Sequence, residues 1–304
     1  MNYVCVIGGA NIDVVCTPLT TVRMRDSNPC TVRYSLGGVA RNIAENLARL
    51  GVKVVFITAL AGDANAERIE SNAAFLGIDL SHCVRVNDGV TSTYTCINDE
   101  KGDMLVAASD MSILKHLTCQ RLEERLDVIN GAQCVVTDTN DADCLRFLQQ
   151  HVTVPLFVDT VSAKKTEIVK NDIKNIFCLK PNLIEAEVLS GIEIRDSQCL
   201  QKAVDVIRSK GVNWVFVSQG KEGVTYSDGA TGHVDSFPVK VVNTTGAGDS
   251  FMAGVVYGYI NGMDISHCAM MGCAASAITV SDRETVSESM SVEKVNNILK
   301  GELQ

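Results

Sequence analysis

Residues 241–254 read VVNTTGAGDSFMAG and join a predicted strand to a predicted helix. Val239, Val241 and Val242 alternate around Lys240, a β-branched pattern that is typical of a strand. The apolar positions that follow recur at helical spacing, which indicates a buried helix. A glycine turn containing one carboxylate therefore separates the two predicted elements.

The glycine turn is suited to holding an anion. Gly246 and Gly248 allow the backbone to turn tightly and to approach a ligand closely. The first amides of the following helix have no partner within that helix, and the helix dipole makes this end positive. Asp249 would repel a bound phosphate, but it can accept the proton of a hydroxyl that attacks a phosphoryl group. An aspartate at a helix start is also an ordinary capping residue, so this turn alone leaves both interpretations open.

Length, charge and cysteine usage narrow the class of protein. The chain has 304 residues, which suits one large domain or a domain with an appendage. Its net charge of −9 argues against nucleic acid as a partner, because neutralising phosphates requires a basic surface. The 12 cysteines lack the paired spacing of a zinc site. With no signal-peptide pattern and no apolar run that could span a bilayer, we expect a cytoplasmic protein without a membrane partner.

The first third of the chain combines a strand with a small inserted sheet. Residues 3–8 predict a strand that runs into Asn11 and Asp13, which point the same way on an extended segment. A carboxylate beside an amide suits a vicinal diol, although both residues also favour turns. Alternation within 14–36 and a hairpin pattern within 91–107 predict a small, partly exposed β-sheet.

A glycine pair opens the next predicted helix. Gly37 and Gly38 precede an amphipathic stretch that Gly51 terminates. Asn42 lies one turn into this helix, where its side chain can reach a ligand near the glycines. The pattern is equally compatible with a solvated Asn42.

From residue 120 onward, helical and strand patterns alternate. Continuous apolar strands are predicted at 134–137, 155–158, 176–179 and 214–218. Such strands between helices predict a doubly wound, mostly parallel α/β sheet with helices on both faces. Ligands of these sheets bind beyond the carboxyl ends of the strands. The polar residues predicted at those ends are Asp138, Asn140, Asp159, Asn182, Glu185, Ser218, Gly220 and Asp249.

Two further positions have alternative interpretations. Asn182 and Glu185 lie three apart at a predicted helix start, where the carboxylate can hold a hydrated Mg²⁺. The same spacing forms a capping box, and the two roles can coexist. Lys165 follows a strand end and offers a cation to phosphate, with a solvated loop as the alternative.

Three ordered motifs resemble the signatures of the ribokinase-like (PfkB) sugar and nucleoside kinases. The glycine pair 37–38 with its helix is similar to the first signature, and 243–249 is similar to the second. Residues 182–185 resemble the Mg²⁺-associated motif of that family. The resemblance implies a ribokinase-like kinase domain over residues 1–304 with a small β-sheet lid, which uses ATP and Mg²⁺.

The resemblance also implies a role for each candidate residue. Asp249 would be the catalytic base, with the transferring phosphoryl group held by Gly246, Ala247 and Gly248. The substrate would be contacted by Asn11, Asp13, Gly38, Asn42 and Thr93. The nucleotide would be contacted by Asn182, Ser218, Gly220 and Lys165. Glu185 would organise the metal.

Further stretches narrow the resemblance to family members that phosphorylate the 5′-hydroxyl of pseudouridine. These stretches are 10–13, 26–29, 37–44, 157–165 and 179–182. The implied reaction is ATP-dependent formation of pseudouridine 5′-phosphate. The alternatives are a kinase for adenosine, inosine or ribose, and a nucleoside-binding regulator without catalysis, against which the intact glycine turn argues.

Two departures from the family pattern qualify these expectations. Asn243 stands where many members have aspartate, at a site linked to a monovalent cation, so dependence on K⁺ stays open. Val39 stands where many have lysine, which argues against a plain ribose kinase. We expect a lid formed by about 14–36 and 91–107 to close over the substrate, and its apolar face to pair two lids in a homodimer.

Overall fold

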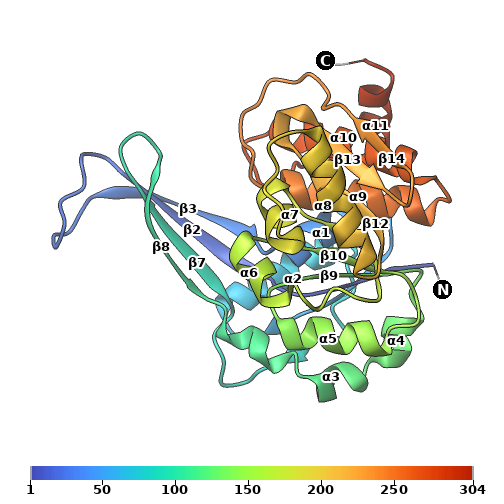
Figure 1. The fold of residues 1–304 in the computed structure, drawn as a ribbon. Helices are drawn as coiled ribbons and strands as arrows, with labels where there is room; N and C mark the ends of the chain where they lie inside the picture. Colours follow the sequence, from blue (N-terminus) through green and yellow to red (C-terminus); the bar gives the residue numbers. More distant parts are fainter. Residues whose placement is uncertain (1, 303–304) are drawn as a thin grey trace.

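An eight-stranded sheet forms the centre of the protein in the computed structural model, which describes residues 2–302 (Figure 1). Its strands are β1 (Val4–Ile7), β4 (Val54–Ile57), β9 (Val135–Asp138), β10 (Leu156–Asp159), β11 (Ile176–Lys180), β12 (Val212–Ser218), β13 (Val224–Ser227) and β14 (Thr231–Val234). They lie in the order β14-β13-β12-β11-β10-β9-β1-β4. All pairs from β4 to β12 are parallel, and β13 and β14 extend the sheet with antiparallel pairing.

Helices cover both faces of this sheet, which confirms the predicted doubly wound α/β class. One face carries α1 (Val39–Arg49), α2 (Ala64–Leu76), α9 (Ala247–Ile260), α10 (Ile265–Val280) and α11 (Val292–Leu299). The other carries α3 (Cys119–Glu123), α4 (Leu126–Asn130), α5 (Ala142–His151), α6 (Ala163–Val169), α7 (Leu183–Ser190) and α8 (Ser197–Ser209). In β1, Val4 and Val6 face the first layer, whereas Cys5 and Ile7 face the second. A strand buried on both faces needs apolar residues at every position, which explains the continuous apolar runs.

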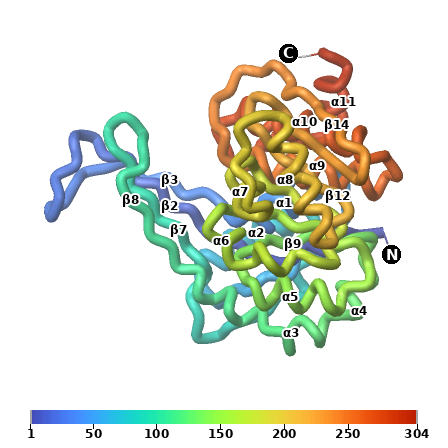
Figure 2. The backbone as a smooth tube through the Cα atoms, in the orientation of Figure 1, coloured from blue at the N-terminus to red at the C-terminus, as the bar shows by residue number. Residues whose placement is uncertain are grey.

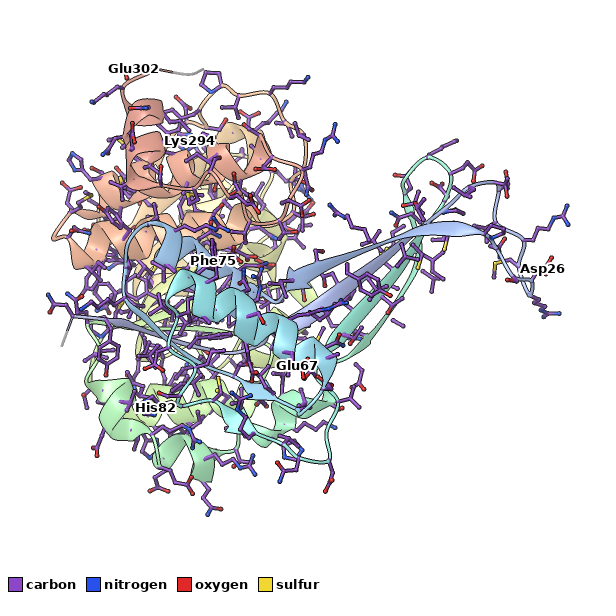
Figure 3. The ribbon with its side chains drawn as sticks, turned by 180° about the vertical axis from the view of Figure 1, so that it is seen from behind. Asp26, Glu67, Phe75, His82, Lys294 and Glu302 are labelled. Atoms are coloured by element: carbon purple, nitrogen blue, oxygen red, sulfur yellow. The ribbon has the colours of Figure 1, made fainter. Side chains whose placement is uncertain are left out.

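A four-stranded sheet projects from this body and is called the small sheet below (Figure 2). It contains β2 (Asn11–Pro18), β3 (Cys30–Gly37), β7 (Thr93–Asn98) and β8 (Met104–Asp110), in the order β3-β2-β7-β8. Seen from behind, Asp26 marks its far tip (Figure 3). The fold is completed by a two-stranded pair, β5 (Ala59–Leu60) with β6 (Val84–Arg85), and by the 3₁₀ turns η1 (Ser112–His116) and η2 (Gly220–Glu222).

The strand predicted around Val239–Val242 is wrong, because this segment is irregular between β14 and α9. The amides of Val242 and Asn243 donate to the Val280 carbonyl, at 2.7 and 3.2 Å, so the segment is anchored to the end of α10. Val241 and Val242 are exposed. Alternating β-branched residues favour an extended backbone, but strand pairing depends on tertiary neighbours that a local pattern does not specify.

Helix lengths also bear on the membrane expectation. Among residues 2–302, no helix combines the length and the apolar character that crossing a bilayer requires. The longest helix there, α10, covers 16 residues. The helical pattern that begins near residue 120 is divided into the short helices α3 and α4.

Candidate active site

A cleft of about 830 Å³ opens between the small sheet and the ends of the central strands. Residues that follow β1, β9 and β10 form its floor, as the doubly wound topology leads us to expect. The structure brings six of the predicted site residues together on its walls: Asn11, Asp13, Gly38, Asn42, Gly246 and Asp249.

Asp249 lies in the first turn of α9 and is 8% exposed. Asn42 Nδ2 donates a hydrogen bond to Asp249 Oδ2 at 2.7 Å, so this carboxylate is directed toward α1. Burial, followed by the negative charge of Asp159, raises the pKa of Asp249 to about 7, against the opposing effects of Asn42, Lys180 and Arg41. A carboxylate with a pKa near neutrality can take a proton from a hydroxyl, as a general base must.

The glycine turn adopts the geometry that an anion site requires. Gly246 has a positive φ of 80°, and a Cβ at this position would lie 2.0 Å from the Thr285 carbonyl oxygen. Any side chain at position 246 would therefore be both strained and obstructed. The turn leads directly into α9, where the Ala247 amide donates to the Thr244 carbonyl at 3.4 Å. The next amides, at Gly248 and Asp249, belong to the first turn of the helix, whose amides lack acceptors within the helix and favour an anion.

Lys180 is a functional candidate that the sequence reasoning missed. Its ammonium nitrogen lies 3.1 Å from the position that a Cβ on Gly248 would occupy, so the charge rests against the glycine turn. It also lies 3.1 Å from Asp159 Oδ2, and both side chains are buried. Burial lowers the pKa of Lys180, but Asp159 and the neighbouring carboxylates outweigh it and raise the pKa overall. The available signal was the place of Lys180 at the end of a buried strand, two residues before the 182–185 motif.

Asn11 and Asp13 form the pair that their spacing predicts. Asn11 Nδ2 donates to Asp13 Oδ1 at 2.6 Å, and both side chains face the cleft from β2. Burial raises the pKa of Asp13, although the Asn11 hydrogen bond and Arg41 oppose the shift. A Cβ on Gly37 would lie 2.5 Å from Asp13 Oδ2, so glycine at position 37 makes room for the carboxylate. The pair can accept and donate hydrogen bonds to two adjacent hydroxyls.

Thr93 is directed away from the cleft, contrary to the expectation that it contacts substrate. Its hydroxyl accepts from Asn65 Nδ2 and donates to the Thr91 carbonyl, both at 3.2 Å. Neighbouring side chains on a strand point to opposite faces, so Tyr94, which pairs with Asp13, lines the cleft instead. A one-residue difference in register decides this and cannot be read from the alternation alone.

Asn182 and Glu185 form the complete capping box that their spacing allows. Glu185 N donates to Asn182 Oδ1 at 2.9 Å, and Asn182 N donates to Glu185 Oε2 at 2.8 Å. Thr160 Oγ1 donates to the same Glu185 oxygen at 2.6 Å. The capping interpretation is thus realised, and Glu185 Oε1 is the oxygen that none of these three bonds uses.

The remaining nucleotide candidates fall in two places. Ser218, the last residue of β12, forms a β-bridge with Asn182, the N-cap of α7. Gly220 follows two residues later and begins η2 with a φ of 60°. Lys165 donates from Nζ to the Asn140 carbonyl at 3.3 Å. Asn140 lines the cleft described above, so Lys165 lies near its edge. The ammonium that lies against the glycine turn is that of Lys180, not that of Lys165.

Comparison with known proteins agrees with this geometry. Residues 1–291 match the pattern of the family described as pfkB family carbohydrate kinase. The chain belongs to the pfkB family of carbohydrate kinases. The resemblance drawn from the three motifs is therefore confirmed, and the protein is a kinase of the transferase class with the ribokinase-like fold.

Individual relatives of this pfkB-family kinase cover almost its whole length. A pseudouridine kinase from Escherichia coli K12 is 34% identical over 303 residues, which are 98% of this chain and 97% of that protein. An uncharacterized sugar kinase from the same strain is 33% identical over 282 residues, which are 91% and 78% of the two chains. A solved structure of a provisionally named sugar kinase from Clostridium perfringens has a TM-score of 0.91 and 34% identity, covering 99% and 96% of the chains.

Proposed function

We propose that this kinase transfers the γ-phosphoryl group of ATP to the 5′-hydroxyl of pseudouridine, giving pseudouridine 5′-phosphate and ADP. The observation that carries the proposal is the position of one raised-pKa carboxylate, Asp249, in the same cleft as the diol-binding pair Asn11 and Asp13. A ribose held by its 2′- and 3′-hydroxyls on that pair can direct its 5′-hydroxyl toward Asp249.

The proposed reaction is positioning combined with charge stabilisation. Asp249 accepts the proton of the 5′-hydroxyl as its oxygen forms a bond to the γ-phosphorus and the bond to ADP breaks. The outward amides of the α9 turn and the Lys180 ammonium stabilise the negative charge on the transferring group. Asn42 holds the base in place from the opposite wall.

ATP with Mg²⁺ is the proposed phosphate donor, bound where the end of β12 and the start of η2, at Ser218 and Gly220, lie beside Asn182. Among residues 2–302, no three His, Cys, Asp or Glu side chains gather as a metal-ligating group. This arrangement fits Mg²⁺, which keeps several waters and takes further ligands from substrate phosphates. Glu185 Oε1 is the protein oxygen we propose for the hydrated ion, which would neutralise phosphate charge.

The substrate is the finer part of the proposal. The stretches 10–13, 26–29 and 157–165 support pseudouridine, as does the similarity to a pseudouridine kinase. A sugar as substrate is the second candidate, since a relative of nearly equal identity is a sugar kinase. The deciding experiment measures ATP-dependent phosphorylation of pseudouridine, uridine, adenosine, inosine and ribose. We expect pseudouridine to have the highest kcat/KM, and a higher value for ribose or a purine nucleoside would overturn the substrate assignment.

We also propose that the small sheet is a lid that closes over the nucleoside and excludes water. Arg33 in β3 forms a 3.2 Å ion pair with Glu284 in the loop after α10, so the small sheet already contacts the body at the cleft mouth. Trapping the enzyme with nucleoside and an ATP analogue should reveal the sheet against the substrate. A crystal structure of that complex with the sheet remote from the nucleoside would contradict the proposal.

A homodimer through paired small sheets is the proposed assembly. The face of the sheet away from the cleft exposes Val32, Tyr34, Ile97 and Val106. Covering such an apolar face with a second copy would remove it from water. Equilibrium sedimentation at micromolar protein should give the dimer mass, whereas the variant Tyr34→Glu should shift the mass toward monomer. Monomer alone for the wild-type protein would reject this assembly.

A further inference from the structure

Arg41, on the first turn of α1, is a buried cation that the proposed chemistry does not use directly. Only 4% of its surface is exposed. Its Nε donates to the Gly37 carbonyl and its Nη2 donates to the Leu36 carbonyl, both at 3.1 Å. These two carbonyls belong to the end of β3, where the small sheet joins α1. The guanidinium therefore holds residues 36–37, the connection between the small sheet and α1, which is called the hinge below.

The guanidinium nitrogen that binds the Leu36 carbonyl also binds Asn42. Arg41 Nη2 also donates to Asn42 Oδ1, which fixes the orientation of that side-chain amide. With its oxygen on Arg41, Asn42 turns its Nδ2 toward Asp249 and donates the 2.7 Å hydrogen bond. The reversed amide would place its oxygen against the carboxylate, where two acceptors repel each other. Arg41 thus selects the amide orientation that Asp249 requires.

The hinge that Arg41 binds also lies against the proposed diol-binding pair, Asn11 and Asp13. Gly37 lies directly against Asp13: a Cβ on Gly37 would be only 2.5 Å from Asp13 Oδ2. The Gly37 carbonyl accepts from Arg41, so one peptide unit joins the substrate-binding carboxylate to the guanidinium. A displacement of the hinge would act on both ends of the bound nucleoside.

We propose that Arg41 is a positioning residue that couples the hinge of the small sheet to the base Asp249 through Asn42. The inference rests on the proposed role of Asp249. When the hinge residues Leu36 and Gly37 are in place, the guanidinium orients Asn42 and the base is aligned. When the hinge moves, Arg41 loses two of its acceptors and the Asn42 amide loses its orientation, so catalysis follows the position of the small sheet.

The charged groups around Asp249 set its pKa, which determines the acid limb of the pH–activity profile. Asp249 is influenced by Asp159 at the end of β10, Lys180 at the end of β11 and Arg41 on α1. The Asn42 hydrogen bond and the two cations lower its pKa, whereas burial and Asp159 raise it. Loss of the oriented amide therefore moves the acid limb of the activity profile to higher pH.

Arg49 provides a matched control on the same helix. It forms an ion pair with Glu45 at 2.7 Å, and Arg41 pairs with the same carboxylate. Arg49 contacts neither the hinge carbonyls nor Asn42 in the bonds it makes, which go to Glu45 and to the Glu288 carbonyl. Replacing either arginine leaves Glu45 paired with the other, so Arg49→Lys controls for the loss of one arginine partner of Glu45.

The experiment compares Arg41→Lys with Arg49→Lys in the phosphorylation assay. Lysine keeps the charge but cannot span several acceptors as the guanidinium fork does. We expect Arg41→Lys to lower kcat by about 10- to 100-fold, as a misaligned group does, and to shift the acid limb upward. Arg49→Lys should keep the wild-type kcat and pH profile. An Arg41→Lys enzyme that behaves like Arg49→Lys would overturn the inference.

A double-mutant cycle separates positioning from a general structural effect. If Arg41 acts through Asn42, the double variant of Arg41→Lys and Asn42→Ala should have the same kcat as the slower single variant. Multiplied losses would mean that the two residues act independently. Should Arg41→Lys fail to fold, Asn42→Asp keeps an oxygen for Arg41 while removing the donor to Asp249. That variant should show the raised acid limb, and an unshifted limb would reject the coupling.

The outcome is distinguishable from failure of the proposed function. If Asp249→Asn had near-wild-type turnover, Asp249 would not be the catalytic base, and the proposed function would fail whatever the result for Arg41. An inactive Asp249→Asn together with a wild-type-like Arg41→Lys would leave the base intact and reject only the coupling through Arg41.

Discussion

Asn42 Nδ2 donates a 2.7 Å hydrogen bond to Asp249 Oδ2, which joins α1 to α9 across 207 positions of the chain. The two glycine motifs that resemble the family signatures thus meet at a single contact. One motif supplies the carboxylate and the other supplies the amide that orients it. The glycine turn and the amide that orients its carboxylate consequently come from distant parts of the sequence.

Replacing Asp249 by Asn should remove the base while keeping the shape of the site. General base catalysis contributes about 10²–10⁴-fold, so we expect kcat to fall by that factor. The KM values for nucleoside and ATP should change little, because the substitution conserves size and the contact with Asn42. Steady-state kinetics on the purified variant would check this, and turnover close to that of wild type would exclude the role.

The stability of the same variant provides the folding control. Because burial raises the pKa of Asp249 from 3.8 to about 7, its bound proton stabilises the folded state below pH 3.8. That contribution is lost as the pH rises through 7. Asparagine is neutral throughout, so Asp249→Asn should be more stable than wild type at pH 8, by on the order of 2–4 kcal/mol, and equal to it near pH 4. Urea unfolding at both pH values measures the difference.

The activity of the wild-type enzyme should fall on the acid side with an apparent pKa near 7. The base must be ionised to take the proton, and the pKa of Asp249 is raised to about 7 by burial and by Asp159. The kcat/KM for the nucleoside, measured between about pH 5 and 9, reports this group in the free enzyme. A profile that stays flat down to pH 5 would show that no group with this pKa limits the reaction.

Substitution of Asp13 by Ala should act mainly on substrate binding. The carboxylate and Asn11 offer acceptors and a donor to the two ribose hydroxyls, whereas the proposed phosphoryl site is the glycine turn before α9. We expect the KM for the nucleoside to rise by about 10- to 100-fold, the loss of one or two charge-assisted hydrogen bonds. The KM for ATP serves as the internal control. An unchanged nucleoside KM would place the ribose elsewhere in the cleft.

Lys180 should be required for turnover more than for folding. Its ammonium lies against the glycine turn and pairs with Asp159, so Lys180→Met removes a cation from the transferring phosphoryl group. Losing one such electrostatic contact typically costs about 10²–10³-fold in kcat. The pKa of Asp249 should also rise, because Lys180 lowers it. Lys170→Met, which breaks a surface ion pair with Glu167, is the control and should retain wild-type kinetics.

Turnover should be the same in K⁺ buffer and in choline buffer. Asn243 Nδ2 donates to the Arg283 carbonyl at 3.1 Å, and Asn243 Oδ1 accepts from the Thr245 amide at 3.0 Å. This neutral side chain therefore ties the glycine turn to the loop after α10 by hydrogen bonds and brings no charge for a cation. Asn243→Asp should make the enzyme respond to K⁺. Activation of the wild-type enzyme by K⁺ would contradict this prediction.

The sequence predicted the layers of the fold better than it predicted the face of a strand on which an individual side chain lies. Continuous apolar strands between helices were sufficient for the doubly wound sheet, and the pattern of 247–260 was sufficient for α9. The same β-branched signal failed at 239–242, because this segment is held by the Val280 carbonyl at the end of α10 and not by strand pairing. The hairpin β13–β14 was not predicted, because short strands of mixed polarity resemble loops.

Candidate site residues divide in the same way. Asn11, Asp13 and Asp249 were identified because their chemistry is expressed in short local motifs. Thr93 was misplaced because register decides which face of β7 meets the cleft. Lys180 was missed because lysine at a strand end carries no local mark of its partners.

By itself, the sequence determined the family, the alternating α/β architecture and the glycine turn with its carboxylate. Each of these depends on periodicity, turn chemistry or motif spacing, which are properties of neighbouring residues. Only the tertiary structure decided that Asn42 holds Asp249, that Lys180 lies against Gly248 and that burial raises the pKa of Asp249. These features arise when distant segments pack together and exclude water, because both contact and desolvation depend on the whole fold.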